Sequence, residues 1–172
     1  GITHSHPDWL VTRWQDRHGF DATERWVTFN NETPKLTLRV NTLRGDRDTV
    51  AAELRGAGVE TTPTPHAPNG LIVVTGNPLR ALDDGLLSAS SGGTGSLSGA
   101  FFVQDEASQL INLAVAARPG ERILDLCASP GGKTLAMAGD MRDTGLIVAC
   151  DVRARRVELL TDTVETSGAA CV

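Results

Sequence analysis

The chain has 172 residues, enough to bury a hydrophobic core in one domain or in two small ones. Its 40% apolar and 22% charged residues are typical of a globular protein, and its net charge of −5 argues against the overall basic field of a self-sufficient nucleic-acid binder. The three cysteines lack disulfide or zinc spacing and no apolar run is long enough to cross a membrane, so we expect a cytoplasmic protein without a metal site or a membrane partner.

Residues 1–34 are predicted to form a helical segment. Helices are expected at about 8–18 and about 21–30, with Gly19 between them. Five of the seven aromatic residues of the chain lie here: Trp9, Trp14, Phe20, Trp26 and Phe29. We favour packing of these tryptophans against the next domain over contact with RNA.

Residues 35–100 are predicted to form a small α+β module. Alternating apolar residues indicate a strand at 35–41, and helical spacing follows at 46–57. A short strand at 59–62 and a second at 71–75 flank a proline-rich loop that ends in a turn at Asn69 and Gly70. The segment 78–87 is either a short helix or irregular, and 92–99 is rich in turns. This order of elements favours an α+β fold.

Residues 101–172 alternate between helix and strand. We expect a helix at about 106–117, strands at 123–126 and 146–150, helices at about 133–139 and 153–166, and the opening of a third strand at 169–172. Such alternation predicts a parallel sheet with right-handed crossovers. Ligands of these sheets bind beyond the carboxyl ends of the strands.

The loop after the first of these strands carries the functional signal. Its glycines allow a ligand close to the backbone, and the helix that follows offers free N–H groups and the positive end of its dipole. Asp151 follows the next strand, where an acidic side chain commonly accepts hydrogen bonds from ribose hydroxyls. The sequence therefore predicts a site for a nucleotide-like cofactor.

Three interpretations of this loop compete. A phosphate-binding P-loop would need glycine at the position of Cys127, although residues 131–134 resemble its end. A structural turn without a ligand would seldom need two glycines, a proline and an acid on the next strand. The interpretation that we favour is the cofactor loop of a Rossmann-like methyltransferase. A nicotinamide enzyme is disfavoured because the dinucleotide spacing G-x-G-x-x-G is absent.

Four segments, in order, resemble the Sun/RsmB-type RNA 5-methylcytosine methyltransferases. Residues 125–134 resemble their motif D-x-C-A-A-P-G-G-K-T, with Ser129 in place of an alanine. Residues 5–10 resemble S-H-P-x-W-L, 38–43 resemble L-R-V-N-T-L, and 103–108 resemble V-Q-D-E-A-S. This resemblance covers nearly the whole chain. It implies an α/β protein in which an RNA-recognition-like module at 35–100 precedes the first half of a Rossmann-like, S-adenosylmethionine-dependent methyltransferase domain at 101–172.

The resemblance also implies the cofactor and the site. S-adenosylmethionine would lie against the glycine loop, Asp151 would hold the ribose hydroxyls, and Arg156 matches a basic position that often follows that acid. RNA, of ribosomal origin, would be the substrate. The implied cofactor-binding residues are Cys127, Ala128, Ser129, Pro130, Gly131, Gly132, Lys133, Asp151 and Arg156.

The same resemblance leaves the catalytic residues unassigned. In that family a cysteine thiolate in a T-C-S segment adds to carbon 6 of cytosine, and a second cysteine lies in a P-C-S segment. None of Cys127, Cys150 and Cys171 has such neighbours. We therefore expect this chain to be a fragment that is inactive alone and that self-associates through the apolar edge of its sheet. A different class, a non-catalytic RNA-binding module using Arg39, Arg44, Arg47 and the N-terminal arginines, stays open, although the module at 35–77 lacks aromatics for base stacking.

Overall fold

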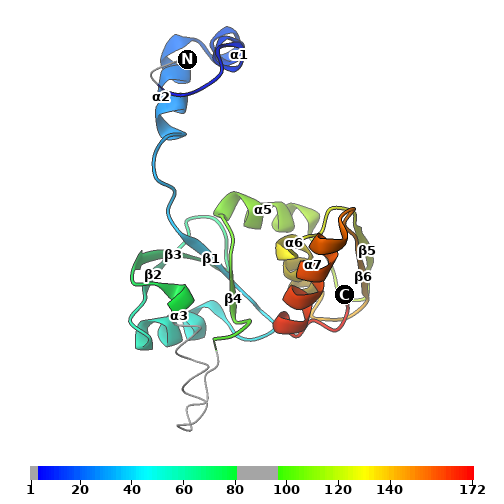
Figure 1. The fold of residues 1–172 in the computed structure, drawn as a ribbon. Helices are drawn as coiled ribbons and strands as arrows, with labels where there is room; N and C mark the ends of the chain where they lie inside the picture. Colours follow the sequence, from blue (N-terminus) through cyan, green and yellow to red (C-terminus); the bar gives the residue numbers. More distant parts are fainter. Residues whose placement is uncertain (1–3, 81–96) are drawn as a thin grey trace. The chain divides into compact units, whose positions relative to one another are not determined.

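The computed structural model describes residues 4–80 and 97–172. The chain divides into two compact units, Gly1–Lys35 and Leu36–Val172 (Figure 1). The segment predicted at 78–87 and the turn-rich segment at 92–99 fall mostly outside the described residues. Within the described ranges, no helix has both the length and the apolar character needed to span a bilayer.

The first unit is a helical hairpin. Helix α1 (Asp8–His18) and helix α2 (Phe20–Phe29) meet at Gly19, whose φ of 81° lies in the region that favours glycine. Trp14 packs edge-to-face on Trp26 with ring centroids 6.3 Å apart, and Trp26 stacks on Phe29 at 5.9 Å. These aromatic residues therefore pack on one another within the unit, and their packing against the next domain stays a prediction.

The second unit begins with a four-stranded antiparallel sheet in the order β2-β3-β1-β4. Leu38 of β1 pairs with Leu71 of β3 and with Val103 of β4. Strand β4 lies in the segment that we expected to open the methyltransferase domain, and it instead forms the edge of the small sheet. The elements in chain order are β1 (Thr37–Val40), α3 (Arg47–Gly56), β2 (Glu60–Pro63), β3 (Gly70–Thr75) and β4 (Phe101–Val103).

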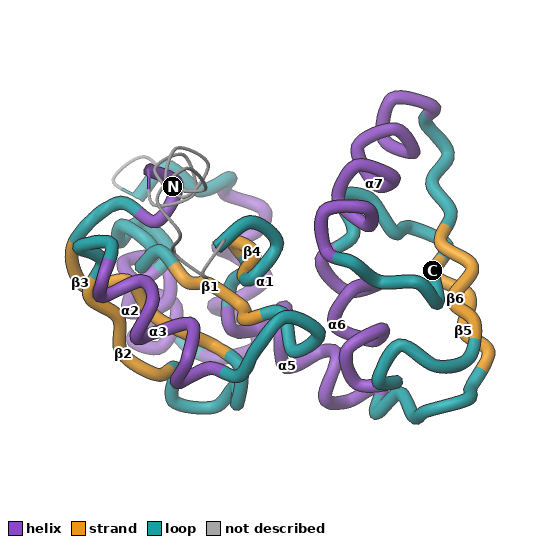
Figure 2. The backbone as a smooth tube through the Cα atoms, turned by 90° about the horizontal axis from the view of Figure 1, so that it is seen from below, coloured by secondary structure: helices purple, strands orange, loops and turns teal. Residues whose placement is uncertain are grey.

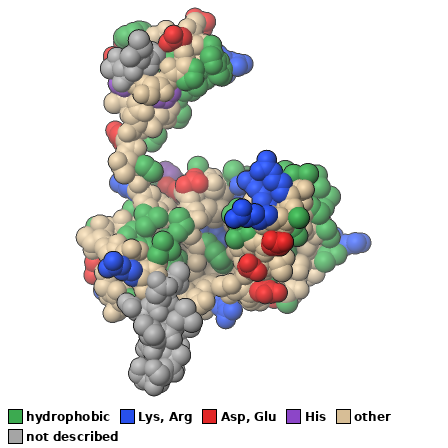
Figure 3. Space-filling model, in the orientation of Figure 1, with side chains coloured by type: hydrophobic (Ala, Val, Ile, Leu, Met, Phe, Trp, Pro, Cys, Tyr) green, Lys and Arg blue, Asp and Glu red, His purple; other side chains and the backbone are tan. Residues whose placement is uncertain are grey.

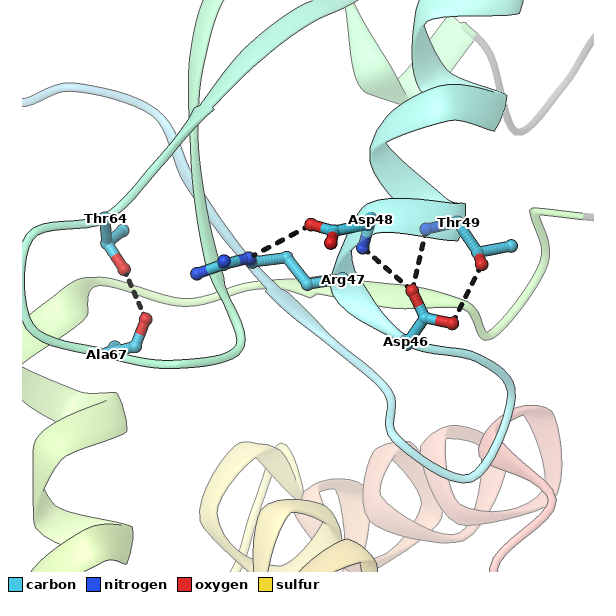
Figure 4. Close-up of polar contacts among 6 residues, drawn as sticks. All are labelled: Asp46, Arg47, Asp48, Thr49, Thr64 and Ala67. Atoms are coloured by element: carbon cyan, nitrogen blue, oxygen red, sulfur yellow. Dashed lines mark hydrogen bonds and ion pairs between the residues drawn. The ribbon is translucent and has the colours of Figure 1, made fainter.

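Local hydrogen bonds explain where α3 begins. The Asp46 carboxylate caps the helix by accepting from the backbone N–H groups of Asp48 at 3.0 Å and Thr49 at 2.9 Å, and from the Thr49 hydroxyl at 2.9 Å (Figure 4). The same view shows the Thr64 hydroxyl donating to the carbonyl of Ala67 at 2.7 Å, which closes the turn between β2 and β3. Both the helix cap and the turn use residue types, aspartate and threonine, whose side chains commonly hydrogen-bond to nearby backbone groups.

Strand β1 is buried on both faces because α3 and α5 (Glu106–Val115) lie on opposite sides of the sheet (Figure 1). Leu38 and Val40 join a core cluster with Val50 and Leu54 of α3. Arg39 points to the other side, where it hydrogen-bonds to residues outside the small sheet. The small sheet therefore has α3 packed on one face and α5 on the other.

The second sheet is a parallel pair, β5 (Arg122–Asp125) and β6 (Leu146–Ala149), in which Ile123 lies opposite Ile147. Helices α6 (Gly132–Asp140) and α7 (Ala154–Ser167) lie on the same side of this pair (Figure 2). Leu124 and Val148 on the opposite face are exposed.

The strand expected at 169–172 is not formed. The Asp143 carboxylate accepts from the N–H groups of Ala170 at 2.8 Å and Cys171 at 2.9 Å, so these donors are not available for a ladder. One strand-like bond remains, from the N–H of Ile147 to the carbonyl of Cys171 at 2.7 Å. The parallel order that we predicted is confirmed for β5 and β6.

Helix α6 approaches the segment after β1 very closely. A Cβ atom placed on Gly139 would lie 2.4 Å from the hydroxyl oxygen of Thr42. Below this contact, Met137 and Met141 of the α6 region pack with Ile147 in a second core cluster, and Leu43 is packed against its margin. A larger residue at 139 would therefore force the Thr42 side chain to move.

We predict that Leu54→Ala destabilises the second unit. Leu54 is 0% exposed in the first core cluster, so its truncation removes buried apolar surface and leaves a cavity. The expected loss in free energy of unfolding is about 2–5 kcal/mol, measured by urea denaturation. Val74→Ala on β3 is the matched control, since Val74 is 59% exposed and its change should stay within about 0.5 kcal/mol. Equal losses for the two variants would contradict this assignment of the core.

Candidate cofactor site

The carboxyl ends of β5 and β6 meet at one edge of the parallel sheet. The N–H of Cys150 donates to the carbonyl of Asp125 at 2.8 Å, and the N–H of Ala128 donates to the carbonyl of Cys150 at 2.9 Å. Hydrogen bonding therefore continues past the strand ends into the glycine loop. Asp151 comes directly after Cys150, so the loop and the acid follow neighbouring strands.

The two glycines of the loop have protein neighbours that explain them. Gly131, the N-cap of α6, has φ of 107°, and a Cβ there would lie 3.2 Å from Leu160 of α7. A Cβ on Gly132 would lie 3.2 Å from the side-chain nitrogen of Gln104. No side chain caps α6 at Gly131, and its first turn holds no acidic residue. The positive end of this helix is therefore not compensated by a side chain of the helix itself.

Asp125 ties the two ends of the loop together. Its carboxylate accepts from the hydroxyl of the buried Thr134 at 2.7 Å and from the N–H of Cys127 at 3.3 Å. In a P-loop the corresponding threonine hydroxyl binds the Mg²⁺ of the nucleotide. Because the hydroxyl of Thr134 is already bonded to Asp125, the arrangement disfavours the P-loop interpretation.

A pocket of about 280 Å³ lies along the loop. Three of its lining residues, Val103, Gln104 and Asp105, come from β4 and the turn before α5. Gly131, Asp151 and Arg156 do not line this pocket. The other predicted loop residues all line it: Cys127, Ala128, Ser129, Pro130, Gly132 and Lys133.

Asp151 is directed toward the start of α7. Its side chain is 5% exposed, and its carboxylate lies 3.8 Å from the guanidinium of the exposed Arg156. The carboxylate also accepts from the N–H of Arg153 at 3.3 Å. The structure thus pairs the two predicted site residues Asp151 and Arg156 with each other, and their contact with a cofactor stays a prediction.

The cysteines differ in their surroundings. Cys127 is exposed on the loop, Cys150 is half-buried, and Cys171 is buried. Burial, together with the nearby Asp143, raises the pKa of the Cys171 thiol to about 11. A thiolate is the nucleophilic form, so Cys171 is poorly suited to attack a base near neutral pH. Among the residues that the structure describes, no group of three or more His, Cys, Asp and Glu side chains could hold a metal ion.

Two residues outside the loop bind its helix directly and were missed as site residues. The Arg39 guanidinium donates to the carbonyl of Gly132 at 3.1 Å, and the Asn112 amide donates to the carbonyl of Lys133 at 2.8 Å. The sequence makes both Arg39 and Arg44 candidates for RNA contact, and Arg44 also has a protein partner, since it donates to the carbonyl of Ser167 at 3.1 Å. The segment 38–43 was a signal for Arg39, but only the fold shows that this arginine faces the loop.

The fold defines the class of protein. A small antiparallel sheet is joined to a parallel βαβα unit whose glycine loop lies at the carboxyl ends of the strands. This is an N-terminal module followed by part of a Rossmann-like domain.

Comparison with known proteins gives the family. Residues 6–80 match the ferredoxin-like domain of the RsmF/B-like methyltransferases, and residues 112–171 match the 16S rRNA methyltransferase RsmB/F family. Because both matches name the same family and together take in most of the chain, the chain belongs to the RsmB/F-like methyltransferases.

Individual relatives agree with this assignment. The "Probable ribosomal RNA small subunit methyltransferase B" of Bacillus subtilis is 31% identical over 95% of this chain and 34% of its own length. The protein of the same name from Synechocystis sp. is 33% identical over 98% of this chain and 35% of its own length. The crystal structure of PH0851 has a TM-score of 0.81 and 32% identity over 98% of this chain and 36% of that chain. The chain therefore spans about a third of the length of the curated relatives it matches.

We predict that Thr134→Val loosens the loop. The valine keeps the size of the side chain but leaves the Asp125 carboxylate without its buried donor, so unfolding should become easier by about 1.5–3 kcal/mol. Urea denaturation gives the value. Thr134→Ser keeps the hydroxyl and is the control, with a smaller loss. If both variants lose the same stability, the hydrogen bond to Asp125 does not hold the loop.

Proposed function

We propose that this chain forms the S-adenosylmethionine-binding edge of an RNA (cytosine-5) methyltransferase that acts on ribosomal RNA. One observation carries the proposal: the glycine loop and the uncapped start of α6 follow β5, beside the strand whose end holds Asp151. Membership of the RsmB/F-like family supports the reaction type. The names of the relatives, which are ribosomal RNA methyltransferases, support the class of RNA.

In this proposal the residues of the chain bind and orient the cofactor. Residues 127–133 line its methionine and ribose side, with the N–H groups at the start of α6 as donors. Asp151 accepts from the ribose hydroxyls, and Arg156, 3.8 Å away, holds that carboxylate in place. Bound S-adenosylmethionine would supply the electrophilic methyl group. We assign these residues no part in the attack on the base, because none of the three cysteines has the neighbours that the attacking thiol has in the resemblance.

The alternative of a purely RNA-binding module loses one of its three arginines at 39–47. Arg39 is buried, whereas Arg44 stays exposed while it donates to the carbonyls of Ser167 and Thr166, and Arg47 is half-buried. The face of the molecule in Figure 3 carries a group of basic side chains beside acidic ones, and not one extended basic surface. Contact with phosphates needs accessible positive charge, so this alternative is the weaker one.

We predict that S-adenosylhomocysteine protects Cys127 from alkylation. Cys127 is exposed on the loop, so iodoacetamide should label it in the free protein. At ten times the dissociation constant only about one tenth of the protein is free, and the labelling rate should fall about tenfold. Mass spectrometry reads the label at each cysteine. Mg²⁺-ATP is the control, and protection by Mg²⁺-ATP with none by S-adenosylhomocysteine would favour the P-loop interpretation.

We predict that Asp151→Asn weakens the binding of S-adenosylhomocysteine. The change removes a charged acceptor for the ribose hydroxyls, and the expected loss is about tenfold in affinity, measured by calorimetry. Glu158→Gln is the control, since Glu158 is an exposed acid on α7, the helix that follows Asp151. Unchanged affinity in Asp151→Asn would remove Asp151 from the site.

A further inference from the structure

Arg39 is a buried cation that reaches the cofactor loop from the small sheet. It is 4% exposed, and it donates through Nε to the Gln104 side chain at 2.6 Å and through Nη2 to the carbonyl of Gly132 at 3.1 Å. Its guanidinium also lies 5.2 Å from the ring centroid of Phe102. The planar guanidinium group is therefore fixed by contacts with three different residues.

Asn112 holds the next carbonyl in the same way. It is buried on α5, and its amide donates to the carbonyl of Lys133 at 2.8 Å. Gln109, one turn earlier on α5, donates to the carbonyls of Leu38 at 3.3 Å and Gln104 at 3.0 Å. Helix α5 is thus tied to β1 on one side and to the start of α6 on the other.

These two carbonyls determine where the donors of the loop point. A peptide group is planar and trans, so its C=O and the N–H that follows point in opposite directions within one rigid plane. Fixing the carbonyl of Gly132 therefore fixes the N–H of Lys133, and fixing the carbonyl of Lys133 fixes the N–H of Thr134. Both N–H groups belong to the first turn of α6, where backbone donors have no acceptor within the helix.

The desolvation penalty of the buried Arg39 charge favours a positioning role over a purely stabilising one. Burial lowers its pKa to about 10, an effect that the nearby Asp140 opposes, so it stays charged near neutral pH. A buried charge has a large desolvation penalty, and an apolar residue of similar volume often gives equal or greater stability. An apolar residue could not hold the carbonyl of Gly132.

We propose that Arg39 and Asn112 are positioning residues that orient the N–H groups at the start of α6 toward S-adenosylmethionine, so that the small sheet sets the cofactor affinity of the neighbouring domain. This inference rests on the proposed function for its ligand. The orientation of the first turn of α6 is a property of the protein alone, and it can be measured without the ligand.

The chain offers a matched control in Arg44. Like Arg39, it lies in the segment 38–44 and donates to backbone carbonyls of the methyltransferase half, those of Ser167 at 3.1 Å and Thr166 at 3.2 Å. These carbonyls are at the last turn of α7 and not at the loop. Arg44→Met therefore removes the hydrogen bonds between the segment after β1 and the last turn of α7, and leaves the contacts of α6 unchanged.

The experiment compares Arg39→Met, Asn112→Ala and Arg44→Met with the unchanged chain. Calorimetry measures the affinity for S-adenosylhomocysteine, and amide hydrogen exchange measures the protection of residues 135–137, whose N–H groups close the first turns of α6. We expect Arg39→Met and Asn112→Ala to weaken binding about tenfold and to raise exchange at 135–137. Arg44→Met should lower the melting temperature but leave binding within about twofold and exchange at 135–137 unchanged.

Each outcome decides the proposal. Equal effects of Arg39→Met and Arg44→Met on binding would overturn it, because the role of Arg39 would then be general stability. If the unchanged chain does not bind S-adenosylhomocysteine, the proposed function fails. Separately, unaltered amide exchange at residues 135–137 in Arg39→Met would overturn the positioning role of Arg39. Should Arg39→Met not fold, Arg39→Lys keeps the charge but not the planar group, and wild-type binding and exchange in Arg39→Lys would also overturn the proposal.

Discussion

A charged guanidinium group inside the second unit links its antiparallel sheet to helix α6. Arg39 belongs to β1 of the antiparallel sheet, yet its hydrogen bonds go to the side chain of Gln104 before α5 and to the backbone carbonyl of Gly132 at the start of α6. A buried cation without such acceptors would cost much stability, so Arg39 holds β1, Gln104 and the start of α6 together. The glycine loop and β1 therefore belong to one polar assembly, on which the shape of the proposed cofactor site depends.

The glycine loop is shaped mainly by protein contacts. Gly131 is favoured by its left-handed backbone and by the nearness of Leu160 of α7, and a side chain at Gly132 would displace the end of the Gln104 side chain. Asp125 closes the loop through Thr134 and Cys127. The motif thus also reflects packing constraints, and a loop held by the protein in this way would lose less entropy on binding the proposed cofactor.

Sequence reasoning located most elements, because their signals are local. The helix expected at 46–57, the strand expected at 35–41 and the loop between β5 and α6 are all confirmed. The pairing of Phe101–Val103 with β1 was not predicted, since nothing near these residues specifies a partner about 60 positions away. The strand at 169–172 was wrong because Asp143, far along the chain, takes its N–H groups. The burial of Arg39 was not predicted for the same reason. An arginine on a strand is expected to be exposed unless the helices packed on that face of the sheet are known.

The contact between Gly139 and Thr42 limits which residues position 139 can hold. A Cβ atom there would lie 2.4 Å from the hydroxyl oxygen of Thr42, so a larger residue fits only if the Thr42 side chain turns away. A substitution at position 139 of α6 would therefore disturb first the segment that follows β1, and the sequence of one half of the second unit is constrained by a side chain of the other.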